Sequence, residues 1–219
     1  MAQASKSSRP ATVPARGHGG RPTAAEAKRR RDHLLETAGE RFLQLGFDGT
    51  SMEAVAESAG ISKQTLYAHY PDKSALFSAV LQQLIDRWLL PISRFEARRG
   101  QLEPTLLEIG RHLLASVLEP SAVQVHRILV AEAGRQSGFG RFAYREGGEP
   151  AIRSIATVLR RHREQLAIAD FETAAEQFLS LVIDHSLRLA TLGVETDPAE
   201  IERRAQAAVA LFLHGALKR

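Results

Sequence analysis

The stretch AGISKQTLYAHYPDK, from Ala59 to Lys73, is unusually polar and aromatic for a segment that lies between two strongly apolar helical patterns. Ser62 follows the apolar Ile61 and is a favourable N-cap for a short helix. That helix must end before Pro71, because proline has no N–H and restricts the residue that precedes it. The spacing therefore predicts a short helix whose polar side chains serve a purpose outside the core.

The predicted short helix has two dissimilar faces. Ile61, Leu66 and Tyr70 are spaced to pack inward on the preceding helices. The outward face carries Lys63, Gln64, Thr65, Tyr67 and His69. Lysine can contact guanine or phosphate, glutamine can pair with adenine through two hydrogen bonds, and the threonine methyl can pack on thymine. We interpret the first three side chains as base-reading and Tyr67, His69 and Lys73 as phosphate contacts. The alternative is a solvated face that binds nothing.

The preceding patterns supply the rest of a helix-turn-helix unit. Apolar residues from Leu34 to Leu45 form one stripe, and Gly46 stands where a C-cap glycine belongs. Thr50 and Glu53 have capping-box spacing, so a second helix is predicted to begin there and to end at Gly60. A helix, a tight turn and a short helix match the helix-turn-helix, whose second helix enters the major groove of DNA.

The whole chain is predicted to be all-α. Its long segments repeat at the helical period, none alternates at period two, and 44% of the 219 residues are hydrophobic. Asp72 caps a long helix that is expected to stop at Pro91, and further glycine and proline breaks divide the remainder into helices. We expect a flexible basic arm over residues 1–24, a helix-turn-helix domain over 25–72, and a helical effector-binding and dimerisation domain over 73–219.

Composition excludes several classes of function. The chain has no cysteine, which excludes disulfides, thiolate metal sites and cysteine nucleophiles. No run approaches the roughly 18 apolar residues of a membrane span, so we expect a cytoplasmic protein, bound at the nucleoid, with no membrane partner. No histidines have the spacing of a helical metal pair, and the adjacent Asp184, His185 and Ser186 cannot converge on one helix. We therefore expect no metal, no cofactor, no catalytic residues and no enzymatic activity.

The positive charge is concentrated at one end of the chain. Met1 to Asp32 holds eight of the 29 Lys and Arg residues but only two of the 25 acidic residues, so this segment carries +6 and the rest −2. Such asymmetry indicates a polyanionic partner. Gly20-Arg21-Pro22 matches the core of a minor-groove AT-hook, so Arg21 is a candidate minor-groove contact, with Arg29, Arg30 and their neighbours on the DNA backbone. The alternative is a solvated tail with only diffuse electrostatic attraction.

The last two predicted helices, Asp170 to Leu192 and Asp197 to Leu217, are apolar on two faces. One face can pack on the domain's own core and the other on a second subunit. The predicted dimer seam comprises Phe178, Val182, His185, Leu189, Ile201, Ala205, Ala208 and Phe212. The alternative is that both helices form the buried centre of a monomer.

From Phe42 to Leu81, FLQLGFDGTSMEAVAESAGISKQTLYAHYPDKSALFSAVL resembles the DNA-binding domain of the TetR/AcrR family of bacterial transcriptional regulators. The resemblance implies a homodimer, a palindromic operator in double-stranded DNA, and a helical C-terminal domain that binds a small molecule and dimerises through its last two helices. It implies DNA contacts at Thr50, Ser51, Lys63, Gln64, Thr65, Tyr67, His69 and Lys73. Tyr70 replaces the usual Phe, and Gln64 stands where Gly or Ala is frequent, which favours sequence-specific reading by Gln64.

A second resemblance concerns ILVAEAGRQSGFGRFAYREGGEP, residues 128–150, which is similar to AefR-like effector domains. A small-molecule pocket is therefore expected between the middle helices. Its candidate lining residues are Trp88, Leu114, Val117, Arg127, Phe139 and Phe142, with Arg127 or Glu132 as the polar anchor. Each of them could equally belong to the core.

These patterns together predict a homodimeric transcriptional repressor that is released from its operator by a small, largely apolar effector. One alternative is an effector-independent or activating DNA-binding regulator. An alternative of a different class is a helical dimeric interaction protein that does not bind DNA, and the outward face of the helix after Ser62 discriminates the two classes.

Overall fold

The computed structural model describes residues 23–97, 100–135, 137–195 and 197–217, and these residues form helices and turns with one isolated bridge between Leu166 and Leu217. The helices are α1 (Ala24–Gly49), α2 (Met52–Ser58), α3 (Lys63–His69), α4 (Lys73–Ala97), α5 (Leu102–Val117), α6 (Pro120–Glu132), α7 (Ser137–Ala143), the π-helical turn η1 (Tyr144–Gly148), α8 (Glu149–Arg161), α9 (Phe171–Thr191) and α10 (Pro198–Ala216). The predicted all-α fold class is confirmed.

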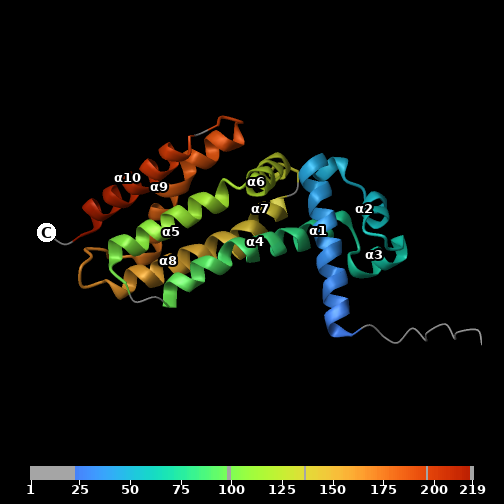
Figure 1. Cartoon of the computed structure of the whole chain (residues 1–219), viewed down its shortest axis with the longest axis horizontal. Coiled ribbons are helices and arrows are strands. Elements are labelled where there is room, and N and C mark those ends of the chain that lie inside the picture. Colours follow the sequence, from blue (N-terminus) through green and yellow to red (C-terminus); the bar gives the residue numbers. More distant parts are fainter. Residues whose placement is uncertain (1–22, 98–99, 136, 196, 218–219) are drawn as a thin grey trace, which may run out of the picture.

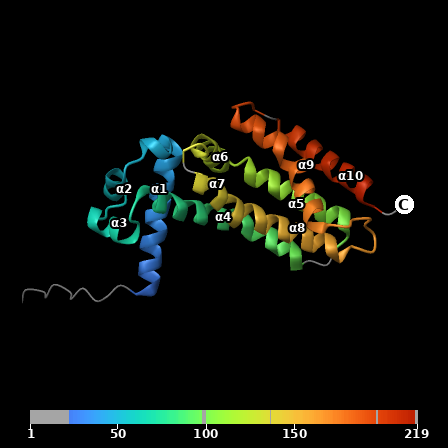
Figure 2. The same cartoon turned by 180° about the vertical axis from the view of Figure 1, so that it is seen from behind.

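The helices form two regions. Figure 1 shows α1, α2 and α3 as a small unit at one end, from which α4 leads into an elongated bundle that contains α5, α8, α9 and α10. The view from behind in Figure 2 shows α6 and α7 between the two regions. The small unit therefore lies at one end of a long molecule, with both of its short helices on the outside.

Four aromatic rings form the centre of the small unit. Phe42 and Phe47 of α1 pack edge-on against Phe77 of α4, with ring centroids 4.9 and 5.5 Å apart. Phe139 of α7 completes the group, 5.1 Å from Phe47 and 4.9 Å from Phe77. Such edge-to-face pairs contribute about 0.5–1.5 kcal/mol each beyond the burial of their area. The core behind α2 and α3 is therefore shared with the C-terminal region.

The bundle core is formed by the inward faces of α5, α8, α9 and α10. Phe178 of α9 and Phe212 of α10 meet edge-on, with centroids 5.1 Å apart. Asp170 caps α9, and Asp197 caps α10 with Pro198 at the first helical position, as the sequence predicts. Both helices are thereby fixed at their starts by local bonds and along their lengths by packing.

The predicted end of the fourth helix at Pro91 is wrong, because α4 continues to Ala97. A proline inside a helix removes one backbone hydrogen bond, and packing along the rest of the helix can offset that loss. The first half of α4 is packed in this way, with Leu76, Phe77 and Leu81 fully buried.

Candidate nucleic-acid interface

Local hydrogen bonds set the ends of the helix-turn-helix formed by α2 and α3. The Ser51 hydroxyl accepts from the Ala54 N–H at 3.1 Å, and the Ser62 hydroxyl accepts from the Thr65 N–H at 3.1 Å. Between the helices Gly60 has a φ of +65°, a left-handed conformation that costs glycine little because it has no Cβ. The turn therefore depends on one glycine and two serine caps.

The faces of α3 are divided as the spacing predicts. Leu66 is fully buried, Tyr70 is 8% exposed, and Ile61 packs against the same core. The exposed side chains are Lys63, Gln64, Thr65, Tyr67, Ala68 and His69. A helix that is anchored along its back and polar along its front can hold donors and acceptors at fixed positions for base edges.

Glu53 of α2 stands beside this face, although its spacing from Thr50 indicates only a capping role. The Tyr67 hydroxyl donates to the Glu53 carboxylate at 3.4 Å, and the Lys63 ammonium lies 3.8 Å from the same oxygen. Desolvation by neighbouring side chains, and after it the Glu53 carboxylate, raise the pKa of Tyr67, so the phenol stays protonated and able to donate at neutral pH. The exposed Lys63–Glu53 pair is weak, which leaves Lys63 free to exchange Glu53 for phosphate or guanine.

Two predicted DNA contacts point into the protein instead. Thr50 is 3% exposed, and its hydroxyl donates to the Gly46 carbonyl at 2.8 Å. Thr50 therefore closes α1, and Ser51 is the N-cap of α2. The Lys73 ammonium donates to the Phe47 carbonyl at 2.7 Å and lies 4.5 Å from the centre of the Phe47 ring. Carbonyls at the end of a helix lack intrahelical partners and attract a nearby hydroxyl or cation, so both side chains have a structural role here, and their contact with DNA stays a prediction.

The first turns of α1 place basic side chains next to α3. The Thr23 N–H donates to Glu26 at 2.9 Å in a capping box that opens the helix. Arg29, Arg30 and the lysine and arginine on either side of them are exposed, and Figure 1 shows this half of α1 extending past α3. A groove of about 880 Å³ between the two helices is lined by Lys28, Arg30, Arg31, Ser62, Thr65 and His69, over an apolar floor. Arg21 lies outside the described residues.

The predicted effector-pocket residues do not converge on one cavity. Phe139 and Phe142 belong to the core of the small unit, whereas Leu114 is buried in the bundle core. Val117 is half-buried at the end of α5. The helices that carry these residues face two different cores, an arrangement that the spacing within each helix does not encode, and their contact with an effector stays a prediction.

The polar members of that prediction also have other roles. The Trp88 indole N–H donates to Glu119 at 3.3 Å. The Arg127 guanidinium donates to the Ala190 and Thr191 carbonyls at 2.8 and 2.9 Å, so it ties α6 to the end of α9. Glu132 is 4% exposed, and within the described residues one of its carboxylate oxygens has no hydrogen-bond partner.

Most residues of the predicted dimer seam are buried within the chain's own bundle, and the seam itself stays a prediction. The residues buried inside the chain's own bundle are Phe178, Val182, Ala205, Ala208 and Phe212. Leu189 and Ile201 are half-buried, and His185 is exposed. The bulky stripe faces inward because it gains the most from burial within one chain. The exposed apolar surface of α9 and α10 is the neighbouring stripe, where Leu181, Leu192 and Leu211 are 44%, 72% and 64% exposed.

The described residues hold neither a metal-binding cluster nor a single helix that could span a membrane. In that part of the chain no three His, Asp or Glu side chains are grouped so that they could hold a metal ion. No single described helix combines the length and apolar content of a membrane span, and α5 with α6, bent by 68°, meets those criteria only as a pair.

Comparison with known families covers both regions. The model for the C-terminal domain of AefR-like transcriptional repressors matches residues 104–215, and the model for bacterial regulatory proteins of the tetR family matches residues 34–80. The transcriptional regulator RutR of Escherichia coli K12 is 44% identical over 77 residues, which are 35% of this chain and 35% of RutR. The match to this curated relative thus spans about a third of its length.

Two solved structures match most of the chain. A TetR-family transcriptional regulator from Mesorhizobium loti has a TM-score of 0.81 and 28% identity, over 88% of this chain and 98% of that one. The Flavonoid-responsive Regulator FrrA has a TM-score of 0.73 and 32% identity, over 88% and 99% of the two chains. These relatives are regulators and not enzymes, in agreement with the prediction of no enzymatic activity. The chain belongs to the TetR family of DNA-binding transcriptional regulators, with an AefR-like C-terminal domain.

Proposed function

We propose that this regulator is a homodimeric repressor that binds a palindromic operator in the cytoplasm, at the nucleoid. The observation that carries the proposal is the outer face of α3, where Lys63, Gln64 and Thr65 are exposed on a helix anchored by Leu66. Gln64 reads adenine, Lys63 contacts guanine or phosphate, and Tyr67 and His69 set the register on the backbone. The basic start of α1 neutralises further phosphates and steepens the salt dependence.

A second subunit seats on the exposed stripe of α9 and α10. Leu181, Leu192 and Leu211 are large apolar side chains that the described part of the chain leaves 44%, 72% and 64% exposed, and their burial between two copies is favourable. A two-fold arrangement presents two α3 helices to major grooves about one turn of DNA apart. This requirement supports a palindromic operator.

The repressor is released by a small, largely apolar effector. FrrA, which is 32% identical over 88% of this chain, is described as flavonoid-responsive, and this supports a hydroxylated aromatic molecule as the effector class. The dimer can adopt conformations that differ in the spacing of the two α3 helices. An effector that binds one of these conformations more tightly than another shifts the dimer towards it. The shared core around Phe139 supports such coupling, since it joins α7 to α1 and α4.

Genome-wide footprinting with the purified protein, followed by operator titrations, tests the proposal. The triple variant Lys63→Ala, Gln64→Ala, Tyr67→Ala should lose about a hundredfold or more in operator affinity, because each base contact contributes about 1–3 kcal/mol. The control Arg153→Ala, an exposed change on α8, should bind like the wild type. A triple variant with wild-type affinity would show that α3 does not carry the interaction with DNA.

A further inference from the structure

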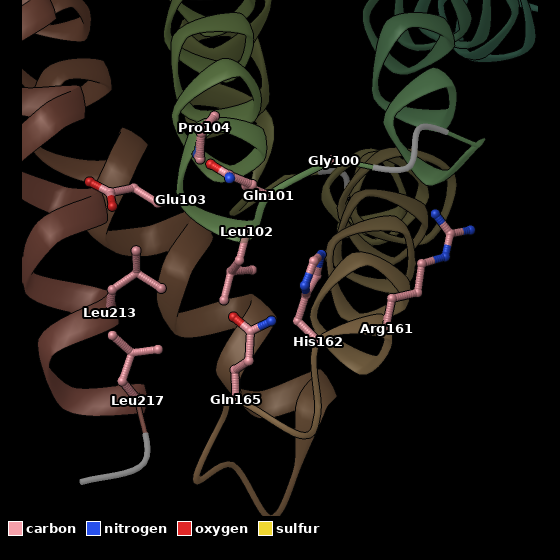
Figure 3. Close-up of a pocket in the computed structure, with 10 residues that line it drawn as sticks. All are labelled: Gly100, Gln101, Leu102, Glu103, Pro104, Arg161, His162, Gln165, Leu213 and Leu217. Carbon is pink, nitrogen blue, oxygen red and sulfur yellow. The ribbon is translucent and has the colours of Figure 1, made fainter.

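We infer that a cavity at the end of the bundle remote from α3 is the binding site for a hydroxylated aromatic molecule, an inference that rests on the effector class proposed above. The cavity measures about 1000 Å³ and opens between the start of α5, the end of α8 and the end of α10 (Figure 3). This volume is at the upper end of the range of roughly 300–1,000 Å³ that small-molecule sites occupy.

Three leucines form the apolar wall of the cavity. Leu102 and Leu213 are 5% and 7% exposed and continue into the bundle core, while Leu217 is 43% exposed at the mouth. The Ala167 N–H donates to the Ala216 carbonyl at 2.7 Å, which holds the turn after α8 against the end of α10. The backbone next to Leu217 is therefore held in place by the turn after α8.

Polar side chains line the same space from the residue before α5 and from the turn after α8. Gln101 is the N-cap residue of α5, yet its side chain makes no capping bond. Figure 3 shows His162 and Gln165 beside Leu102, and among the described residues neither side chain has a hydrogen-bond partner in the protein. Unpaired amide and imidazole groups beside leucines suit a ligand with an apolar body and phenolic hydroxyl or carbonyl groups at its edge.

The packing below the cavity discriminates between ligand shapes. A long acyl chain needs a deep and uniformly apolar channel, but the wall residues Leu102 and Leu213 pack directly into the bundle core, and half of the lining is polar or charged: Gln101, Glu103, Arg161, His162 and Gln165. A flat ring system needs only the leucine wall and the polar rim. The cavity therefore fits an aromatic ligand rather than a fatty acid.

α4 connects this cavity with the DNA-binding unit. It ends at Ala97, just before the lining residue Gly100, and it begins at Lys73, which is bonded to the end of α1. At 1.5 Å per residue a helix of 25 residues is roughly 37 Å long. A ligand that displaces the start of α5 would therefore act on one end of a rod whose other end carries the small unit.

Isothermal titration of the full chain with the flavonoid naringenin tests the site. Gln165→Trp places an indole in the cavity from an exposed position, and the control Glu164→Trp makes the same change at the adjacent exposed residue, which does not line the cavity. Naringenin affinity should fall about tenfold or more in Gln165→Trp and stay unchanged in Glu164→Trp. Both variants should bind operator like the wild type when naringenin is absent.

The outcomes separate the site from the proposed function. If Gln165→Trp binds naringenin and leaves the operator as the wild type does, the effector class stands and this site is overturned. If the wild type binds operator but not naringenin, the site and the effector class both fall while the assignment as a DNA-binding regulator stands. Decanoate provides a third arm, because decanoate binding that Gln165→Trp abolishes would overturn the aromatic assignment.

Discussion

Replacing Lys73 with Met should weaken the fold without removing a phosphate contact. The Lys73 ammonium donates to the Phe47 carbonyl at 2.7 Å and lies 4.5 Å from the Phe47 ring centre. A hydrogen bond from a charged group contributes about 1.5–3 kcal/mol, and a partly exposed cation–π contact adds about 0.5–1 kcal/mol. Methionine keeps the apolar stem and removes both contacts, so the free energy of unfolding should fall by about 2–4 kcal/mol.

The salt dependence of operator binding distinguishes this role from a phosphate contact. Each neutralised phosphate contributes about 0.9 to the slope of log affinity against log salt concentration. Lys63→Met, on the exposed face of α3, should lower that slope by about 1 and leave the urea midpoint unchanged. Lys73→Met should lower the urea midpoint and leave the salt slope unchanged. The salt slopes of the two variants are measured by fluorescence anisotropy of labelled operator, without urea, under conditions in which both variants are folded. A Lys73→Met variant with wild-type stability and a reduced slope would refute the structural role of Lys73.

Three further predictions concern the seam, the turn and the half-buried His126. Leu211→Asp should stay folded and become monomeric in light scattering, and a dimeric Leu211→Asp chain would show that this stripe is not part of the seam. Phe212→Ala, by contrast, should lose about 3–5 kcal/mol of unfolding free energy, because Phe212 is buried in the bundle core. Gly60→Ala should lower the urea midpoint by an amount equivalent to about 1–2 kcal/mol through its positive φ alone, since nothing lies within 4 Å of the added Cβ, and an unchanged midpoint would contradict a strained turn. Burial lowers the pKa of His126 in the folded chain, so protonation favours unfolding. The contribution of His126 to stability should be full above about pH 6.5 and should decrease as the pH falls towards the lower folded pKa. In thermal unfolding, the melting temperature of His126→Gln should therefore depend less on pH than that of the wild type.

The helix starts could be predicted from sequence because a cap is a local event. Ser62, Asp170 and Asp197 each bond to an N–H two or three residues ahead, within a window that the sequence displays. Thr50 and Ser51 could not be separated in this way, since two adjacent hydroxyls fit the same window. The end of α1 decided between them, because its Gly46 carbonyl takes the Thr50 hydroxyl and leaves Ser51 as the cap.

The outward face of α3 could also be predicted, but the side chains at the junctions between helices could not. Lys73 bonds to a carbonyl 26 positions earlier in the chain, and Arg127 bonds to carbonyls 63 and 64 positions later. Phe139 packs on rings from α1 and α4. Periodicity indicates which face of a helix is buried, yet it carries no information on which distant element covers that face.

The shared core has a consequence for how the two regions act together. Val125 and Ile128 of α6 and Phe139 of α7 belong to the same buried cluster as Leu66, which anchors α3. Because close-packed interiors have low compressibility, a displacement of α6 or α7 changes the support of the DNA-binding face through direct contact. Arg127 extends the same path to the end of α9, next to the stripe that a second subunit would cover. A displacement of α6 or α7 can therefore reach the DNA-binding face without a separate hinge, because the core of the small unit already includes side chains of both helices.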